Sequence, residues 1–343
     1  MKEFNLNNLV RKNILNLQPY ISFRDNNEFN APVFLDVNEC PFGEFNRYPD
    51  STQKKFKNKL AELKKVAPSQ IALGNGSDEL IDLIIKIFCE PKKDTILMMN
   101  PSFAMYAFYA AVNENEVVKL NLDENFEIIK DDFLKIAQER DIKVFFLCSP
   151  NNPTGNSIKD IEFFVQNFDG IVVIDEAYIE FSGNGSAIEL LDKYPNLIVM
   201  QTFSKAWGAA GARVGVAYAS EEIIRFINTV KAPYNVNSLS QELILKLLDN
   251  KDKLKENVDG ILQERTWLEK EFKNMECIIK VFPTDANFFL IKMKNVDEVY
   301  DKMLKAEILT SKRAPAIPDC IRINVGSREE NEKLINVLKA IAS

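Results

Sequence analysis

From about position 71 the chain alternates short apolar runs with amphipathic stretches. The apolar runs predict strands at 71–73, 95–99, 117–120, 143–148, 170–174, 197–200 and 214–218. Several of these runs are continuously apolar, as expected of strands that are buried on both faces. Between them apolar residues recur at helical spacing, as at Leu80, Leu83 and Ile84, and again over 131–139 and 159–167. The pattern predicts an α/β fold with a mostly parallel sheet covered by helices.

The pattern changes after Pro233. A long helix is predicted over 251–272, and a helix near 296–306 and a closing helix from Glu329 follow it. Strand-like segments lie between them at 278–282, 287–291 and 321–325. We therefore expect a large α/β domain at 30–235. A smaller α+β domain would combine 236–343 with the N-terminal arm, 1–29.

Composition narrows the functional classes. The chain has 343 residues, enough for one large and one smaller domain, and a net charge of -7 without basic blocks, which argues against a nucleic-acid surface. Five scattered cysteines without a Cys-x-x-Cys pair predict reduced thiols in a cytoplasmic protein, with neither a disulfide framework nor a metal site. We expect no signal peptide and no membrane span, since the best apolar stretch, 80–88, contains Asp82 and Lys86.

The chain contains no histidine. This excludes Ser-His-Asp hydrolysis, Cys-His proteases, histidine-ligated zinc and histidine general bases. Proton transfer in any reaction must then fall to Lys, Tyr, Asp, Glu, Cys or a cofactor.

The segment 201–213 carries the most informative chemistry. An apolar run delivers two hydroxyls, Thr202 and Ser204, and then Lys205 into a turn of small residues, and Arg213 follows eight positions later. A lysine can form a Schiff base with an aldehyde, while hydroxyls and a forked guanidinium can hold a phosphate. The alternative is a surface lysine beside a small-residue turn.

Two further segments fit a ligand of this kind. Asp175 ends the apolar run 171–174, so its carboxylate emerges where open α/β sheets bind ligands, and a protonated pyridine nitrogen would be a suitable partner. The segment 74–79 joins a strand to a helix, whose N-terminus offers free N–H groups to a phosphate. The alternatives are a structural ion pair or helix cap for Asp175, and an ordinary turn with Ser77 as the N-cap.

Three more side chains would complete a site for a planar ring. Asn152, in the proline-rich turn 149–155, and Tyr178 could both contact a ring hydroxyl, and Phe103 could stack on the ring. Alone, each of them is equally compatible with an ordinary turn or a hydrophobic core. Together with Lys205 they require a ligand with an aldehyde, an aromatic ring, a ring hydroxyl, a ring nitrogen and a phosphate. Pyridoxal 5′-phosphate has all five.

The sequence resembles the type I pyridoxal-phosphate enzymes, which have the aspartate-aminotransferase fold, and among them the histidinol-phosphate aminotransferase family. The matching motifs run in family order over nearly the whole chain, at 38–39, 47–49, 74–79, 88–91, 149–155, 175–181, 202–213, 232–237 and 321–326. They are highly specific for fold and cofactor. They are less specific for substrate, because aromatic aminotransferases and the phosphothreonine decarboxylases share most of them.

The resemblance implies a role for each matched residue. Lys205 would be the Schiff-base lysine and proton carrier, and Asp175 would keep the ring nitrogen protonated. Asn152 and Tyr178 would contact the ring oxygen, and Phe103 would stack on the ring. The implied phosphate-binding residues are Gly76, Ser77, Asp78, Thr202, Ser204, Arg213 and, from the other subunit, Tyr48. The implied substrate-binding residues are Tyr20, Asn38 and Arg322, of which Arg322 would hold the α-carboxylate of glutamate.

The implied protein is a homodimeric cytoplasmic aminotransferase of histidine biosynthesis. It would convert L-histidinol phosphate and 2-oxoglutarate to imidazole-acetol phosphate and L-glutamate. Two departures bear on this expectation: the chain is short between Pro41 and Tyr48, and Thr310 stands where the family has an arginine for the substrate's phosphate. Lys312 and Arg313 are the candidates to replace that arginine. The alternatives are an aromatic amino-acid aminotransferase, which Thr310 favours, and a phosphothreonine decarboxylase.

Overall fold

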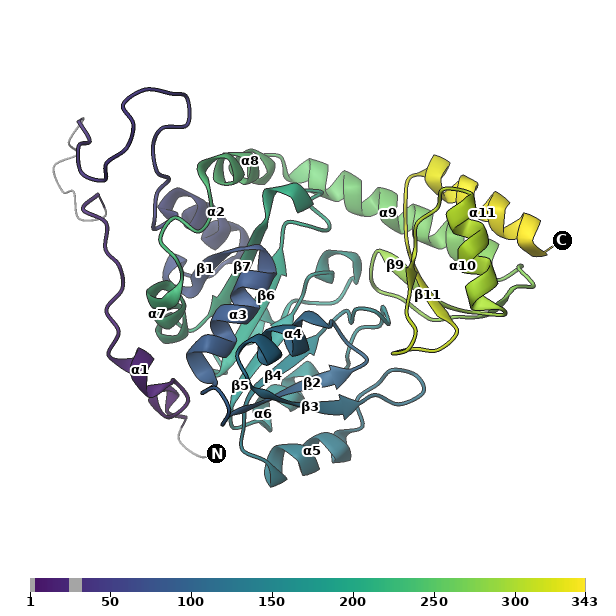
Figure 1. The fold of residues 1–343 in the computed structure, drawn as a ribbon, viewed down its shortest axis with the longest axis horizontal. Helices are drawn as coiled ribbons and strands as arrows, with labels where there is room; N and C mark the ends of the chain where they lie inside the picture. The colour runs from purple at the N-terminus through teal and green to yellow at the C-terminus, as the bar shows by residue number, and fades with distance from the viewer. Residues whose placement is uncertain (1–3, 25–32, 343) are drawn as a thin grey trace.

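A computed structural model describes residues 4–24 and 33–342 (Figure 1). Its larger body is built on a seven-stranded sheet in the order β1-β7-β6-β5-β4-β2-β3. The strands are β1 (Ile71–Asn75), β2 (Thr95–Asn100), β3 (Glu116–Asn121), β4 (Ile142–Cys148), β5 (Ile171–Asp175), β6 (Leu197–Thr202) and β7 (Val214–Ala219). Strand β7 is antiparallel to both of its neighbours, and the other pairings are parallel. The predicted α/β class with a mostly parallel sheet is confirmed.

The continuous apolar runs explain why the sheet is covered on both faces. Strands β5, β6 and β7 are buried at every position, so the side chains on both faces are shielded from water. Seven helices of the described chain pack around this sheet: α2 (Lys54–Lys64), α3 (Gly76–Phe88), α4 (Met105–Val112), α5 (Lys130–Glu139), α6 (Ile161–Gln166), α7 (Glu221–Val230) and α8 (Ser238–Asp249). Short 3-10 turns lie at η2 (Pro68–Gln70), η3 (Ile179–Phe181), η4 (Ala187–Leu190) and η5 (Ala210–Ala212).

The strand directions gather the predicted site residues at one edge of the sheet. Strands β1, β2, β4, β5 and β6 all point the same way, so their carboxyl ends share an edge. Strand β7 runs in the opposite direction, so the residue before it, Arg213, lies at that same edge. Five strand–loop junctions and the start of β7 therefore converge where open α/β sheets bind ligands.

The smaller body is a four-stranded antiparallel sheet with helices packed against it. Its strand order is β10-β11-β9-β8, from β8 (Ile278–Val281), β9 (Phe288–Met293), β10 (Ser311–Lys312) and β11 (Cys320–Asn324). The helices are α9 (Lys251–Phe272), α10 (Val296–Lys305) and α11 (Arg328–Ala342). It has its own core, which includes Leu268, Phe272 and Ile291. Figure 1 shows α9 running from the larger body to this smaller one.

The N-terminal arm packs differently from the sequence-based prediction. Leu6, Val10 and Ile14, spaced four residues apart around η1 (Leu6–Asn8) and α1 (Lys12–Leu15), are buried in the core of the larger body. The Arg11 N–H donates to the Ile87 carbonyl at 2.9 Å. We therefore propose that this part of the arm belongs to the larger body rather than to the small domain, because an apolar stripe predicts burial but does not identify the core that it joins.

The predicted boundary at 235 precedes a helix, α8, that packs on the larger body. Ile244 and Leu248 of α8 belong to the core of the larger body. Within α9, Leu254 and Val258 pack where the two bodies meet, and Leu268 is the first α9 residue buried in the small core. We propose a domain boundary inside α9 rather than at its start.

Among the described residues, no helix is long and apolar enough to cross a membrane. The same part of the chain contains no group of three or more acidic, cysteine or histidine residues arranged to hold a metal ion.

Candidate active site

Asp175 lies where the sequence predicted, at the carboxyl end of β5, and is 3% exposed. Its Oδ2 accepts a hydrogen bond from the Tyr106 hydroxyl at 2.7 Å, and its Oδ1 accepts one from the Ala177 N–H at 3.1 Å. Burial raises the pKa of Asp175, and the Tyr106 hydrogen bond opposes that rise. The described residues place no cation within ion-pair distance of this buried carboxylate. It is suited to pairing with a cationic ligand group.

Lys205 follows β6 in a turn and is partly buried. Its Nζ lies 5.5 Å from the centre of the Tyr178 ring. Burial, and next the positive charge of Arg322, lower the pKa of Lys205, while Asp175 and Asp78 act in the opposite direction. The residues that influence this amine are thus predicted site residues from three separate elements, β5, α3 and β11. A lysine with a lowered pKa has more neutral amine available for nucleophilic attack and proton transfer.

The start of α3 and the segment before β7 form a close backbone cradle. Arg213 has a left-handed φ of 53°, and its carbonyl accepts a hydrogen bond from the Gly76 N–H at 2.8 Å. A Cβ added to Gly76, where φ is +75°, would lie 2.4 Å from Nη2 of Arg213. A Cβ added to Gly215 would lie 2.5 Å from the Ser77 N. Position 76 requires glycine because of its left-handed φ, and position 215 because a Cβ there would meet the backbone of Gly76 and Ser77.

This cradle offers the donors that an anion needs. The Arg213 Nη2 donates to Asp78 Oδ2 at 3.3 Å, and both side chains remain partly exposed. The N-cap residue of α3 is Asn75, whose side chain accepts no hydrogen bond from the first turn, so the alternative of a Ser77 cap is wrong. The hydroxyls of Thr202 and Ser204 lie 3.0 Å apart beside it. An uncapped helix N-terminus, two hydroxyls and a guanidinium form a phosphate-type site.

Residues of the smaller body reach the site from β9 and β11. Arg322 donates through Nη1 to Asn152 Oδ1, and its guanidinium carbon lies 5.3 Å from the centre of the Phe288 ring. The Tyr178 ring packs edge-on against the same Phe288, with the centroids 5.2 Å apart. The site is therefore formed where the two bodies meet. Asn152 contacts the predicted substrate-binding arginine in addition to any role toward a ring.

Phe103 is partly buried and packs edge-on against Tyr106, with the ring centroids 5.5 Å apart. Sequence reasoning missed Tyr106, which is fully buried, stacks on Phe146 and donates to Asp175. The available signal was a tyrosine one helical turn after Phe103 in an otherwise apolar helix. This signal was weak, because core tyrosines occupy the same kind of position.

The three predicted residues from the N-terminal part lie in an exposed arm. Tyr48 is half exposed and stacks on Tyr234, with the centroids 4.6 Å apart. Tyr20 is 58% exposed, and Asn38 is exposed with a left-handed φ of 58°. The described contacts of Tyr48 are thus with its own arm and with Tyr234 rather than with Lys205.

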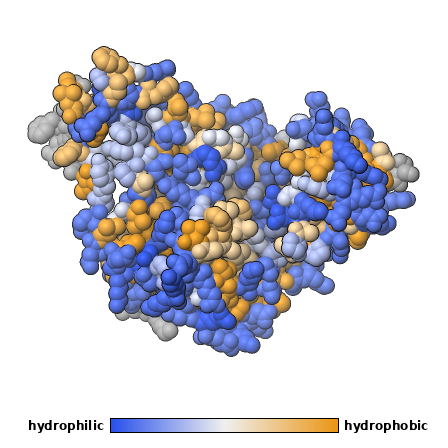
Figure 2. Space-filling model, viewed as in Figure 1, coloured by the Kyte–Doolittle hydropathy of each residue, from blue (hydrophilic) through white to orange (hydrophobic). Residues whose placement is uncertain are grey.

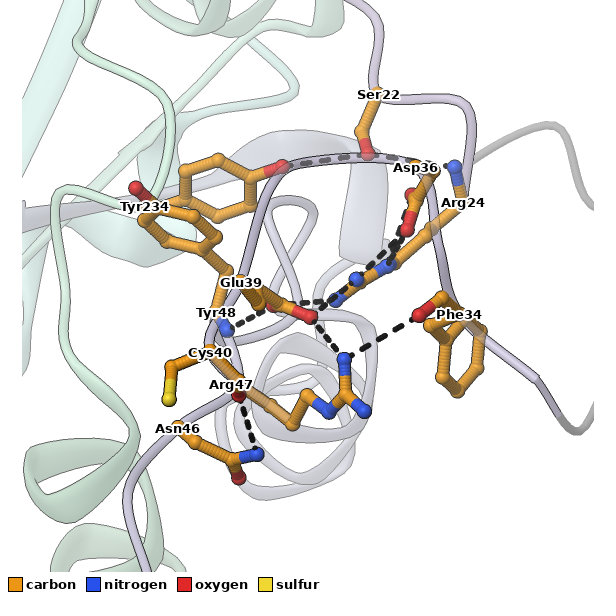
Figure 3. A network of polar contacts seen from close by, with 10 residues as sticks. All are labelled: Ser22, Arg24, Phe34, Asp36, Glu39, Cys40, Asn46, Arg47, Tyr48 and Tyr234. Atoms are coloured by element: carbon orange, nitrogen blue, oxygen red, sulfur yellow. Dashed lines mark hydrogen bonds and ion pairs between the residues drawn. The ribbon is translucent and has the colours of Figure 1, made fainter. Parts of the chain in front are cut away.

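A buried carboxylate organises this arm (Figure 3). The side chain of Glu39 is 3% exposed, and it accepts hydrogen bonds from both terminal nitrogens of Arg24, at 2.9 and 2.7 Å. It also accepts from Arg47 Nη1 at 2.7 Å and from the Tyr48 N–H at 2.6 Å. The Arg24 hydrogen bonds lower the pKa of Glu39 to about 2, so it stays ionised. Glu39 therefore holds the backbone of Tyr48 in place.

Comparison with known proteins identifies the family. The model of the aminotransferases of class I and II matches residues 32–338. The chain belongs to the class I and II aminotransferases. This aminotransferase is 48% identical over 339 residues to histidinol-phosphate aminotransferase of Parabacteroides distasonis, covering 97% of this chain and 98% of that one.

Solved structures give the same fold for this aminotransferase. The histidinol-phosphate aminotransferase of Clostridium acetobutylicum superimposes with a TM-score of 0.80 at 26% identity, covering 87% of this chain and 91% of that one. The enzyme of the same name from Sinorhizobium meliloti, in complex with pyridoxal-5′-phosphate, has a TM-score of 0.80 at 22% identity. It covers 86% of this chain and 83% of that one. The likeness to the first structure extends over both bodies of the aminotransferase.

Proposed function

We propose that this aminotransferase transfers the amino group of L-histidinol phosphate to 2-oxoglutarate, giving imidazole-acetol phosphate and L-glutamate in histidine biosynthesis. The observation that carries the proposal is the cluster around Lys205. One amine with a lowered pKa lies under the influence of a buried carboxylate, Asp175, and of two arginines from separate elements, Arg213 and Arg322. The relative at 48% identity, which is named for this substrate, supports the choice of substrate.

Pyridoxal phosphate fits the residues that are present. Enzymes of this family use the cofactor, which, when bound, supplies the aldehyde and the electron-accepting ring of the reaction. The glycine cradle of Gly76 and Gly215, with Ser77, Asp78, Thr202, Ser204 and Arg213, would hold its phosphate. The buried carboxylate of Asp175 would pair with the ring nitrogen and keep it protonated.

Each protein group would then have a defined role in the reaction. Lys205 would bind the aldehyde carbon between turnovers and, once released, carry a proton to and from the substrate's Cα. Asn152 and Tyr178 would hold the ring hydroxyl, and Phe103 would lie against the ring. Arg322 would bind the α-carboxylate of glutamate, because Asn152 already orients its guanidinium. Tyr20 and Asn38 would contact the substrate from the arm.

We further propose a cytoplasmic homodimer in which the arm covers the partner's site. The arm exposes large apolar side chains that water disfavours, among them Leu35 at 92% and Phe42 at 82% exposure. Val33 and Phe45 lie in the same segment, and Figure 2 shows apolar surface where this arm protrudes. A second copy would bury this surface and bring Tyr48 to the phosphate of the other subunit.

Replacement of the lysine tests the function. Lys205→Ala is expected to abolish turnover of L-histidinol phosphate with 2-oxoglutarate and to change the absorbance of the bound cofactor. Lys255→Ala, on the exposed face of α9, serves as the control and should retain both properties. Turnover by Lys205→Ala within tenfold of the wild type would contradict the assignment.

A further inference from the structure

Strands β10 and β11 place two arginines on one face of the small sheet. Ser311 pairs directly with Arg322, and the Arg313 N–H continues the ladder by donating to the Cys320 carbonyl at 2.9 Å. Side chains two residues apart on a strand point to the same face, and diagonal neighbours across a ladder lie within reach of each other. Ser311, Arg313 and Arg322 therefore share a face. The Arg313 Nη1 donates to Ser311 Oγ at 3.2 Å.

This face is directed toward the active site. Arg322 donates to Asn152, which follows β4 in the larger body. On the same side, Cys320 belongs to a cluster with Phe282, against which Phe126 of the larger body packs with a centroid distance of 4.9 Å. A group bound between the two arginines would thus lie next to the loop that carries Asn152.

The two guanidiniums carry like charge and have unused donors. The Nε atoms of Arg313 and Arg322 are both buried without a hydrogen-bond partner, and in residues 4–24 and 33–342 neither arginine forms an ion pair. Burial, and next the charge of Arg322, lower the pKa of Arg313. Buried donors without partners and adjacent cations both cost free energy, and a bound anion would offset both costs.

The neighbouring cation, Lys312, cannot bind an anion between the two arginines. Lys312 lies on the other side of the strand, where its Nζ donates to Asp297 Oδ1 at 2.6 Å and lies 5.6 Å from the centre of the Tyr300 ring. Thr310 carries no charge, and its buried Oγ1 has no partner. Of the two charged residues at 312 and 313, Arg313, which directly follows β10, is the one that faces the site.

We propose that Arg313, beside Arg322, binds the phosphate of the amino donor and so supplies the cation that is absent at Thr310. The inference rests on the proposed function and specifies its substrate class as a phosphate monoester. It also makes Arg313 the residue that selects a phosphate monoester over an uncharged aromatic side chain. A planar guanidinium can hold two oxygens of a phosphate at once, which an ammonium group cannot do.

The test compares Arg313→Gln with the matched control Lys312→Gln in single-turnover reactions of the holoenzyme. For L-histidinol phosphate, Arg313→Gln should raise the half-saturating concentration about 10- to 100-fold, because a charge-assisted contact is lost. The limiting rate should change less than about threefold. The reaction with L-phenylalanine should stay within about twofold. Lys312→Gln should match the wild type with both substrates. The half-saturating concentration of Arg313→Lys for L-histidinol phosphate should lie between those of the wild type and Arg313→Gln.

Inhibition by inorganic phosphate separates this inference from the proposed function. In the holoenzyme the cofactor's own phosphate fills the cradle at Gly76, so added phosphate should compete at Arg313. Arg313→Gln should bind phosphate about tenfold more weakly than the wild type. If phosphate inhibited Arg313→Gln and the wild type equally, or if the half-saturating concentration for L-histidinol phosphate were unchanged in Arg313→Gln, the role of Arg313 would be overturned. The proposed function would remain intact. A wild type that does not react with L-histidinol phosphate would refute the proposed function itself.

Discussion

Replacement of Tyr106 by phenylalanine removes one hydroxyl and leaves the aromatic stacking in place. That hydroxyl is the only described hydrogen-bond donor to Oδ2 of Asp175, at 2.7 Å, and both residues are almost fully buried. In Tyr106→Phe the ring can still stack on Phe146, whose centroid lies 4.7 Å away. The substitution therefore isolates the support that one hydrogen bond gives to a buried charge.

The magnitude follows from the burial of the carboxylate. A hydrogen bond to a charged group contributes about 1.5–3 kcal/mol, and the burial of both partners shields this one from bulk solvent. We expect Tyr106→Phe to lower the free energy of unfolding of the cofactor-free enzyme by about 2 kcal/mol at pH 8. The control, Tyr194→Phe, removes a 2.9 Å hydrogen bond to Glu162, whose side chain is 45% exposed. Water can replace that bond, so the loss should stay below about 1 kcal/mol.

The effect should depend on pH with a definite sign. The folded pKa of Asp175 is raised above its ordinary value, so ionisation of Asp175 lowers the stability of the cofactor-free enzyme as the pH rises through that range. Loss of the Tyr106 hydroxyl raises this pKa further. The difference between variant and wild type should therefore be largest at high pH and shrink as Asp175 becomes protonated.

Urea unfolding of the cofactor-free wild type, Tyr106→Phe and Tyr194→Phe, at one protein concentration and at several pH values, measures these differences. A loss for Tyr106→Phe that is constant across pH, or no larger than that of Tyr194→Phe, would refute the assignment of this hydrogen bond to the ionised carboxylate.

Two further predictions concern the cradle and the arm. Gly76→Ala puts a side chain on a left-handed φ of +75° and, with its Cβ 2.4 Å from Nη2, displaces the Arg213 guanidinium. It should weaken cofactor binding at least about tenfold in a fluorescence titration. Gly211→Ala meets nothing within 4 Å and should not, so equal affinities of the two variants would contradict the cradle. Glu39→Gln removes the charge shared by Arg24, Arg47 and the Tyr48 N–H. It should raise the dissociation constant of the proposed dimer in sedimentation more than Asp36→Asn, whose side chain, among the described residues, contacts Arg24 alone. The same dissociation constant for both variants would contradict a role of Glu39 in holding the arm.

Much of the fold was predictable because its signals are local. A strand buried on both faces needs a continuous apolar run, and the seven strands predicted between 71 and 218 are all present in the larger sheet. The ends of those strands then placed Asp175 and Lys205 at one edge of the sheet. Contacts between distant residues gave no such signal. Tyr106 and Asp175 are 69 positions apart, and a tyrosine in an apolar helix does not identify its partner.

The distinction between Lys312 and Arg313 shows the same limit at short range. The two residues are adjacent and both basic, yet alternation from β10 into the residue that follows it directs Lys312 toward Asp297 and Arg313 toward Arg322. The register is set by the pairing of Ser311 with Arg322, a contact with a different strand. Composition and periodicity do not determine that register in a strand of two residues.

A single-turnover absorbance measurement of the holoenzyme tests the proposed reaction. The protein is mixed separately with L-histidinol phosphate, L-phenylalanine and O-phosphothreonine, without a keto acid. We predict rapid conversion of the bound cofactor to its amino form with L-histidinol phosphate, and much slower conversion with the other two. Equally fast conversion by L-phenylalanine would contradict the predicted specificity, and release of carbon dioxide from O-phosphothreonine would indicate a decarboxylase instead.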